Sequence, residues 1–316
     1  MKPFLRILFF LLISTNLFSQ SLAESKVTFL DSCWTESSAE NYKYIRIVED
    51  YYTDKKLYVY KEYYKSKVLK SIGTTLDRDV IRKEGQFISY YENGNKQSNV
   101  NFVKTKKSGK EFNWYENGNI KSEIEYFENK KGDTEYKINN FWNPQKKQTI
   151  ADGNGDYSDT EEHSEESGRI KNGFPDGIWK GKNLKMKSTF TENYENGKLI
   201  SGVTIDSLNV EHPYTVKNQP PSPKKGINSF YSYVGKSMYI PNEARNKVYG
   251  KIYLTFIVDK EGNLVEPKII KGLGYGLDEN AISLIKGAKK WIPGTIRGVP
   301  VQVLYSLPIT IAKNGY

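Results

Sequence analysis

Short alternating runs of apolar and polar residues cover the middle of the chain, and most runs end at a turn-forming pair. The clearest two begin at Gly85 and Gly109, 24 residues apart, and share Tyr-Glu-Asn-Gly-Asn; weaker copies begin at Gly132 and Gly173. Alternation with period two predicts half-buried strands, and Asn-Gly predicts hairpins because both central residues of a type I′ turn need positive φ. Since one hairpin cannot bury its own apolar face, we expect the hairpins to stack into one meandering sheet or solenoid.

The pattern changes after residue 207. Residues 218–226 contain no apolar side chain other than proline, which predicts an extended, semi-rigid connector. Beyond it, alternating runs over 250–259 and 264–271 predict two strands joined as a hairpin. The next segment has apolar residues at helical spacing from Leu277, with Asp278 as the expected N-cap, and residues 299–311 alternate as a final strand with odd positions in the core.

These patterns predict a β-rich N-terminal hairpin-repeat sheet followed by a small α+β C-terminal domain, an antiparallel sheet with one packed helix. Trp291 is expected to pack over that sheet as core. The predicted segments are a repeat region over 24–207, a proline-containing linker over 208–226 and the C-terminal domain over 227–316.

The N-terminus predicts export. Lys2 and Arg6 precede a short apolar run over 7–13, and Ser21-Leu22-Ala23 has the small residues that signal peptidase accepts. We expect residues 1–23 to be a signal peptide, with the mature chain beginning near Glu24. The alternative, a retained membrane anchor, needs about 20 consecutive apolar residues. The expected location is the periplasm; the cell surface, secretion, or the inner membrane with an uncleaved signal are the alternatives.

Composition excludes several kinds of site. The length of 316 residues predicts about two domains at roughly 150 residues each. The net charge of +10 would raise nucleic acid as a partner, but the export signal argues against it. One Cys and two His are too few for a disulfide framework or a zinc site, and neither His163 nor His212 lies in a catalytic motif. We therefore expect no enzyme activity, cofactor or metal.

One acidic stretch begins like a calcium-binding loop. Oxygen-bearing residues alternate from Asp152 to Asp156, but the sixth loop position is Tyr157 rather than Gly and the twelfth is His163 rather than Glu. The interpretation that we favour is a turn within the repeats, followed by a solvated loop from Asp159 to Gly168.

The repeated units resemble the MORN-like repeats of the YwqK antitoxin family, whose pattern is an aromatic pair, Glu-Asn-Gly and a following Gly-x-Trp. The resemblance covers about residues 57–205. It implies an interaction scaffold; the antitoxin role does not transfer, because an exported chain does not meet a cytoplasmic toxin.

The C-terminal segment is similar to the TonB C-terminal domain family over about residues 236–313. The matching motifs, in order, are Ile240-Pro-Asn-Glu-Ala244, Gly250-Lys-Ile-Tyr253, Phe256-Ile-Val-Asp259, Glu261-Gly-Asn263, Gly272-Leu-Gly274, Leu277-Asp-Glu-Asn-Ala281, Trp291-Ile-Pro293, Gly298-Val-Pro-Val301 and Leu307-Pro-Ile309. This chain departs from the family at Ile240, where Tyr is common, and in lacking an evident anchor and long proline-rich span.

The resemblance implies a non-enzymatic periplasmic domain that pairs with the N-terminal segment of outer-membrane transporters by strand addition. The partner-binding residues that it implies lie on the final strand: Val299, Val301, Gln302, Val303, Leu304 and Tyr305. Contact with a membrane would then occur only through such partners, unless the signal is retained.

Two functions remain open at this point. The first is a TonB-like protein of the periplasm that contacts outer-membrane transporters or other envelope proteins. The second is an exported structural or cell-surface scaffold in which the repeat array is the main binding element.

Overall fold

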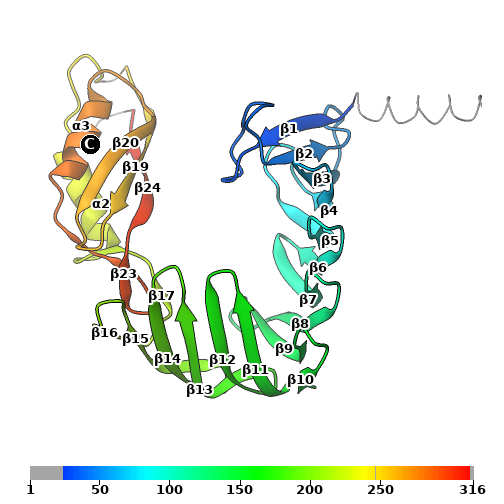
Figure 1. The fold of residues 1–316 in the computed structure, drawn as a ribbon. Coiled ribbons are helices and arrows are strands. Elements are labelled where there is room, and N and C mark those ends of the chain that lie inside the picture. Colours follow the sequence, from blue (N-terminus) through cyan, green and yellow to red (C-terminus); the bar gives the residue numbers. More distant parts are fainter. Residues whose placement is uncertain (1–23, 246, 314–316) are drawn as a thin grey trace, which may run out of the picture. The chain divides into compact units, whose positions relative to one another are not determined.

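The computed structural model describes residues 24–245 and 247–313, so the signal peptide expected at 1–23 lies outside the described residues. Over the described part of the chain, strands β1 to β16 form one sheet in which each strand pairs with the next along the sequence (Figure 1). The predicted β-rich repeat sheet is confirmed. Its strands are β1 (Lys26–Leu30), β2 (Tyr44–Val48), β3 (Tyr58–Tyr64), β4 (Leu69–Thr75), β5 (Lys83–Tyr90), β6 (Lys96–Val103), β7 (Lys106–Trp114), β8 (Ile120–Glu128), β9 (Thr134–Trp142), β10 (Gln148–Ala151), β11 (Asn154–Glu161), β12 (Ser164–Lys171), β13 (Phe174–Asn183), β14 (Ser188–Glu195), β15 (Lys198–Ile205) and β16 (Glu211–Tyr214).

The chain divides into two compact units, and the division falls within this sheet. Residues up to Asp159 and the segment Ser167–Asp176 form the first unit. The segment Thr160–Glu166 and all residues from Gly177 onward form the second. The second unit therefore contains the last repeat hairpins together with the C-terminal domain.

The turns of the strongest repeats differ from the predicted type. Gly94 and Gly118 have φ of 87° and 83°, whereas the preceding Asn93 and Asn117 keep negative φ. The amide of Tyr91 donates to the carbonyl of Asn95 at 2.9 Å, which closes a three-residue loop. These turns are type I turns followed by a left-handed glycine, in place of the predicted type I′. The two-residue type I′ turn occurs at Asn196-Gly197, where φ is 49° and 82°.

A ladder of tyrosine hydroxyls joins successive repeats. The hydroxyls of Tyr64, Tyr91 and Tyr115 donate at 2.9 Å to the carbonyls of Tyr90, Trp114 and Trp142. Each tyrosine lies at the start of a turn and reaches the end of a strand in the following repeat. Burial raises the pKa of Tyr115 to about 12, with a further contribution from the charge of Asp159. These three tyrosines, two of which begin the Tyr-Glu-Asn-Gly motifs at 91 and 115, thus help to fix the spacing of neighbouring hairpins.

Replacing Tyr91 by phenylalanine should destabilise the protein by about 1 kcal/mol, because the carbonyl of Trp114 loses its hydroxyl donor while the ring remains. Urea unfolding of the segment 24–316 measures this change. Tyr52→Phe is the matched control, because Tyr52 is 72% exposed and its substitution should be neutral. Equal unfolding midpoints for the two variants would contradict a structural role for the ladder.

Glycines on the buried face of the sheet lie beneath aromatic rings of the neighbouring strand. Gly181 pairs directly with Phe190, and Gly202 pairs directly with Tyr214. A Cβ atom built on either glycine would lie 2.3 Å or 2.4 Å from the facing ring. Because glycine has no side chain, each ring can pack directly against the backbone of the opposite strand. The rings thereby cover the buried face of the sheet.

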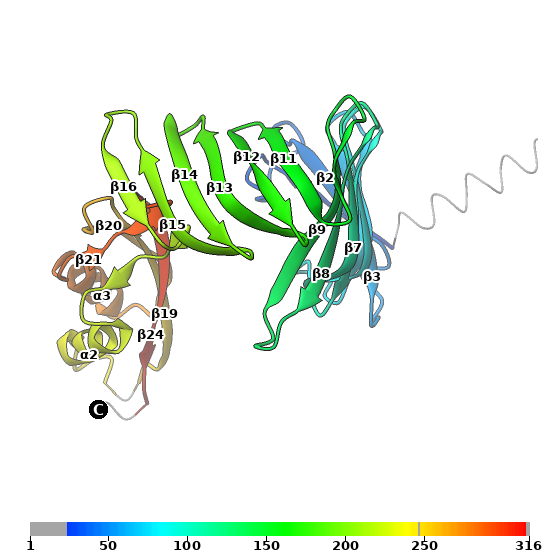
Figure 2. The same cartoon turned by 90° about the horizontal axis from the view of Figure 1, so that it is seen from below.

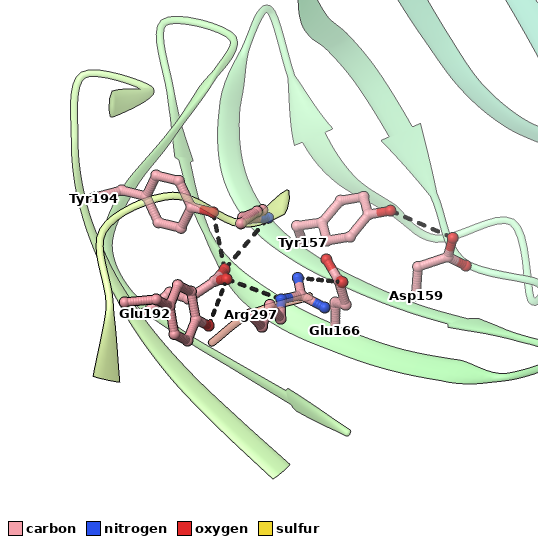
Figure 3. A network of polar contacts seen from close by, with 8 residues as sticks. Tyr157, Asp159, Glu166, Glu192, Tyr194 and Arg297 are labelled. Atoms are coloured by element: carbon pink, nitrogen blue, oxygen red, sulfur yellow. Dashed lines mark hydrogen bonds and ion pairs between the residues drawn. The ribbon is translucent and has the colours of Figure 1, made fainter. Parts of the chain in front are cut away.

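The acidic segment expected as a loop forms strands instead. Asp152 and Gly153 make the β10–β11 turn with φ of 47° and 76°, and residues 159–168 belong to β11, β12 and the short turn between them. Asp159 is buried and pairs with Lys121 at 2.7 Å, and the hydroxyl of Tyr157 donates to it at 3.3 Å (Figure 3). The number of acids predicted a solvated loop, but alternation places Asp159 and Glu166 on the inner face, each with a cation.

The C-terminal domain is an antiparallel sheet of β20 (Leu264–Lys271), β19 (Gly250–Val258) and β24 (Val303–Ile311), in that spatial order. The helices α2 (Ile227–Ser237) and α3 (Leu277–Lys286) pack with this sheet around one core (Figure 2). The small α+β architecture is confirmed, but α2 was not predicted. Ile252, Leu254, Phe256 and Val258 are fully buried on one face of β19.

Asp278 is not the N-cap of α3. The cap position is Gly276, with φ of 75°, and its side-chain-free backbone starts the helix. The carboxylate of Asp278 instead accepts hydrogen bonds from the amides of Leu273 and Gly274, both at 3.0 Å. The residue therefore closes the glycine-rich loop that precedes the helix.

The segment predicted as an extended, semi-rigid connector is paired over parts of its length. Strand β16 joins the repeat sheet, β17 (Asn218–Gln219) pairs with β22 (Gly294–Ile296), and β18 (Ser222–Pro223) pairs with β21 (Trp291–Ile292). Composition predicted the extended backbone, but the residues that pair with β17 and β18 lie 68 to 78 positions later in the sequence. In the described ranges, no helix has the length and hydropathy that crossing a membrane requires.

Candidate functional site

The open edge of the C-terminal sheet lies along β24. Strand β24 pairs with β19 over nine consecutive residues, from Val258↔Val303 to Gly250↔Ile311, without a bulge. In the sheet order β20-β19-β24, it is a terminal strand. Such a strand presents backbone groups on its outer side that another extended segment can pair with.

The β19–β20 turn determines which residues of β24 face this edge. The amide of Asp259 donates to Asn263 at 3.0 Å, so Asp259 and the other odd residues of β19 direct their backbone groups toward β20. The even residues of β19 therefore bond to β24, and they are paired with odd residues of β24. It follows that Leu304 and Ser306 direct their N–H and C=O groups outward.

Two prolines bound the segment that can accept a partner strand. Pro308 has the same outward parity as Leu304 and Ser306 but has no N–H. On the other side, β23 (Val299–Val301) pairs with β22 through Ile296↔Val299 and Gly294↔Val301, which leaves Pro300 as its outward residue. The outward donors of Leu304 and Ser306 thus lie between Pro300 and Pro308, and Pro308 separates them from Thr310, which has the same parity.

The six residues predicted from the sequence fall into different environments. Val299 and Val301 are half-buried in β23, and Gln302 is exposed at the junction between β23 and β24. Leu304 is 69% exposed, while Val303 and Tyr305 turn toward the domain. The structure brings all six into one continuous segment, but it divides the expected single strand in two and shifts the pairing edge toward Ser306.

An aromatic cluster in the core of the C-terminal domain packs against β24 through Tyr305. The ring of Trp291 lies 4.9 Å from those of Phe230 and Tyr305 and 5.6 Å from that of Phe256. Trp291 is 2% exposed, which confirms its predicted place in the core. Burial raises the pKa of the Tyr305 hydroxyl above its ordinary value.

A second feature that the sequence did not reveal is the β22–β23 turn, Arg297-Gly298. Its φ values of 48° and 80° make it a type I′ turn. The Nε atom of Arg297 donates to Glu192 at 2.9 Å, and a terminal nitrogen donates to Glu166 at 2.7 Å (Figure 3). The guanidinium carbon also lies 3.5 Å from the centre of the Phe190 ring. The C-terminal domain is thereby attached to the last strands of the repeat sheet.

Glu192 is the centre of this contact, and its side chain is fully buried. Besides Arg297, it accepts hydrogen bonds from the hydroxyls of Tyr194 and Tyr214, both at 2.8 Å, and Lys217 lies 3.3 Å from it. Burial opposes its ionisation, but the hydrogen bond from Arg297 and the charges of Lys217 and Arg297 outweigh burial and lower its pKa. Burial and the hydrogen bond to Glu192 raise the pKa of Tyr194 and of Tyr214.

One sequence signal could have identified this carboxylate. Strand β14 alternates regularly, with Phe190 and Tyr194 on its buried face, and Glu192 occupies the position between them. A glutamate at an inward position needs a cation. Nothing local indicated that the cation would be Arg297, 105 residues later. Within the described ranges, no three His, Cys, Asp or Glu side chains are grouped as metal ligands.

Comparison with known families agrees with this architecture. Residues 237–310 match the family model described as Gram-negative bacterial TonB protein C-terminal. Residues 83–104 and 107–129 match the one described as MORN repeat variant. A search of curated proteins found no match. The predicted TonB C-terminal domain and preceding MORN-like repeats are confirmed, and together they point to an envelope-associated role in protein interaction.

Proposed function

We propose that this chain is a periplasmic protein that binds N-terminal segments of outer-membrane transporters, or other envelope proteins, by strand addition to β24. The observation that carries the proposal is the outward edge of Leu304 and Ser306 in a domain of the TonB C-terminal family. Backbone hydrogen bonds supply affinity in this mode of binding, and alternate side chains supply selectivity. The role requires neither catalysis nor a cofactor.

The side chains beside this edge favour a particular partner strand. Leu304 pairs with Ile257, which pairs with Val265, so an apolar row crosses the face of the sheet away from the helices. Directly opposite side chains on neighbouring strands contact one another. We therefore expect the partner to place an apolar side chain next to Leu304.

Replacing Leu304 by proline should weaken binding more than tenfold, because it removes an outward N–H and places a ring where the partner strand lies. The native Pro308 has the same parity, so β19 can remain paired. Amide chemical shifts and calorimetry on the mature chain, titrated with peptides from transporter N-termini, measure the effect. Leu304→Ala retains the donor, and it should lose only the apolar side-chain contact.

The same titration tests the alternative function. Shifts confined to residues 302–306 and their neighbours support strand addition. Shifts that cluster on the repeat strands and bypass this edge would overturn it, in favour of an exported scaffold whose repeat array is the main binding element.

A further inference from the structure

The repeat sheet contains a site shaped to receive the β22–β23 turn. Glu192 and Glu166 supply two carboxylates, and Phe190 supplies an aromatic face for one guanidinium. A fully buried carboxylate such as Glu192 is strongly unfavourable without a charged partner. Lys217 lies 3.3 Å from Glu192, but only Arg297 pairs with both Glu192 and Glu166, so the site is complete when Arg297 occupies it.

The backbone of the turn fits the sheet independently of the arginine side chain. The amide of Arg297 donates to the carbonyl of Lys217 at 2.5 Å, and Ile296 pairs with Asn218. A Cβ atom on Gly298 would lie 2.8 Å from the carbonyl oxygen of His212 in β16, so only glycine lets the turn approach this closely. Side-chain charge, strand pairing and steric fit hold the same turn.

The turn is continuous with the proposed binding strand. Val299 follows Gly298 directly, β23 pairs with β22 for three residues, and β24 begins at Val303. Holding the turn therefore restricts the segment from Val299 to Val303 before a partner arrives. An edge that is already ordered loses less conformational entropy when a strand is added to it.

We propose that the last repeat hairpins act as a latch that orders the partner-binding edge, with Arg297, Glu192 and Glu166 as positioning residues. This inference rests on the proposed function. It assigns the end of the repeat array a role in binding although the partner strand pairs elsewhere. Because the coupling is thermodynamic, a bound partner should stabilise the latch by the same factor by which the latch strengthens binding.

The experiment uses the mature chain, residues 24–316, and a transporter N-terminal peptide that binds the wild type. Glu192→Gln and Glu166→Gln should each weaken binding by about fivefold to tenfold, mainly through faster dissociation. Glu165→Gln is the matched control, because Glu165 adjoins Glu166 but pairs with the exposed Lys182 at 3.4 Å. This control should bind like the wild type.

Amide hydrogen exchange supplies a measurement that does not depend on any variant. Saturating peptide should slow exchange at Arg297 and Asn218 in the wild type, and the latch variants should exchange faster over 295–303. If the wild type binds while the latch variants bind equally well and peptide leaves exchange at Arg297 unchanged, the latch proposal is wrong. If the wild type does not bind, strand addition itself fails, and the coupling fails with it.

Discussion

Replacing Gly181 by alanine should destabilise the second unit by about 3 kcal/mol. The added Cβ would lie 2.3 Å from the carbonyl oxygen of Glu165 and 2.3 Å from Cζ of Phe190. The first of these atoms belongs to the backbone of a paired strand and the second to a buried ring, so neither can move away cheaply. Overpacking of this kind costs about 1–3 kcal/mol, and a backbone contact places this site at the upper end.

Urea unfolding of the segment 24–316, followed by aromatic fluorescence, measures the effect. Gly235→Ala is the control, because Gly235 lies in α2 and a Cβ there has no neighbour within 4 Å. That change should stabilise the protein by up to about 1 kcal/mol, since alanine favours helix. If the unfolding free energy of Gly181→Ala lies within about 0.5 kcal/mol of the wild-type value, β12 and β13 can move apart at little cost to relieve the contact.

The repeat sheet could be predicted because its determinants are local. Each strand alternates between apolar and polar residues over a short segment. Each turn is specified by about five consecutive residues, such as Tyr91 to Asn95. The turn type was harder to predict, because Asn-Gly is compatible with both two-residue and three-residue loops. The loop length depends on the register of the flanking strands. The loop that contains Gly94 has three residues, and the loop that contains Gly197 has two.

Helix α2 has a local sequence signal, two apolar residues at helical spacing. Phe230 and Val234 are its buried residues, four positions apart on one helical face. The predicted C-terminal domain begins at residue 227, but no helix was predicted there, and the segment has no side-chain N-cap. Its helical spacing was sufficient to predict the element.

The contacts that attach the C-terminal domain to the repeats could not be predicted locally. Asn218 pairs with Ile296, Ser222 pairs with Ile292, and Glu192 pairs with Arg297. Each pair joins segments far apart in the sequence, and neither partner has a pattern that specifies the other. The open edge of β24 was predictable as a strand, but the limits set by Pro300 and Pro308 emerged only with the register.

The Arg297→Met variant should lose about 3 kcal/mol of unfolding free energy at pH 7. Methionine retains part of the apolar stem, but Glu192 then stays buried with only Lys217 and two tyrosine hydroxyls to balance its charge. Removing one partner of a buried ion pair costs about 3–5 kcal/mol, and Lys217 keeps this case at the lower end. Lys182→Met, which breaks the exposed pair with Glu165, should cost less than about 1 kcal/mol.

The pH dependence of the unfolding free energy tests whether the unpaired Glu192 carboxylate destabilises the Arg297→Met variant. Its pKa in the folded wild type is lowered from 4.5, so its ionised form contributes stability above that pH, and the contribution is lost as the pH falls through the folded value. Without Arg297, burial should raise the pKa of Glu192, so its protonation relieves the variant first. Urea unfolding at pH 7 and near pH 4 should therefore show the wild type and Arg297→Met converging in acid. Adding Glu192→Gln to Arg297→Met should recover part of the loss of unfolding free energy at pH 7. If Arg297→Met is instead destabilised equally at both pH values, lost packing, and not the unpaired carboxylate, is the cause.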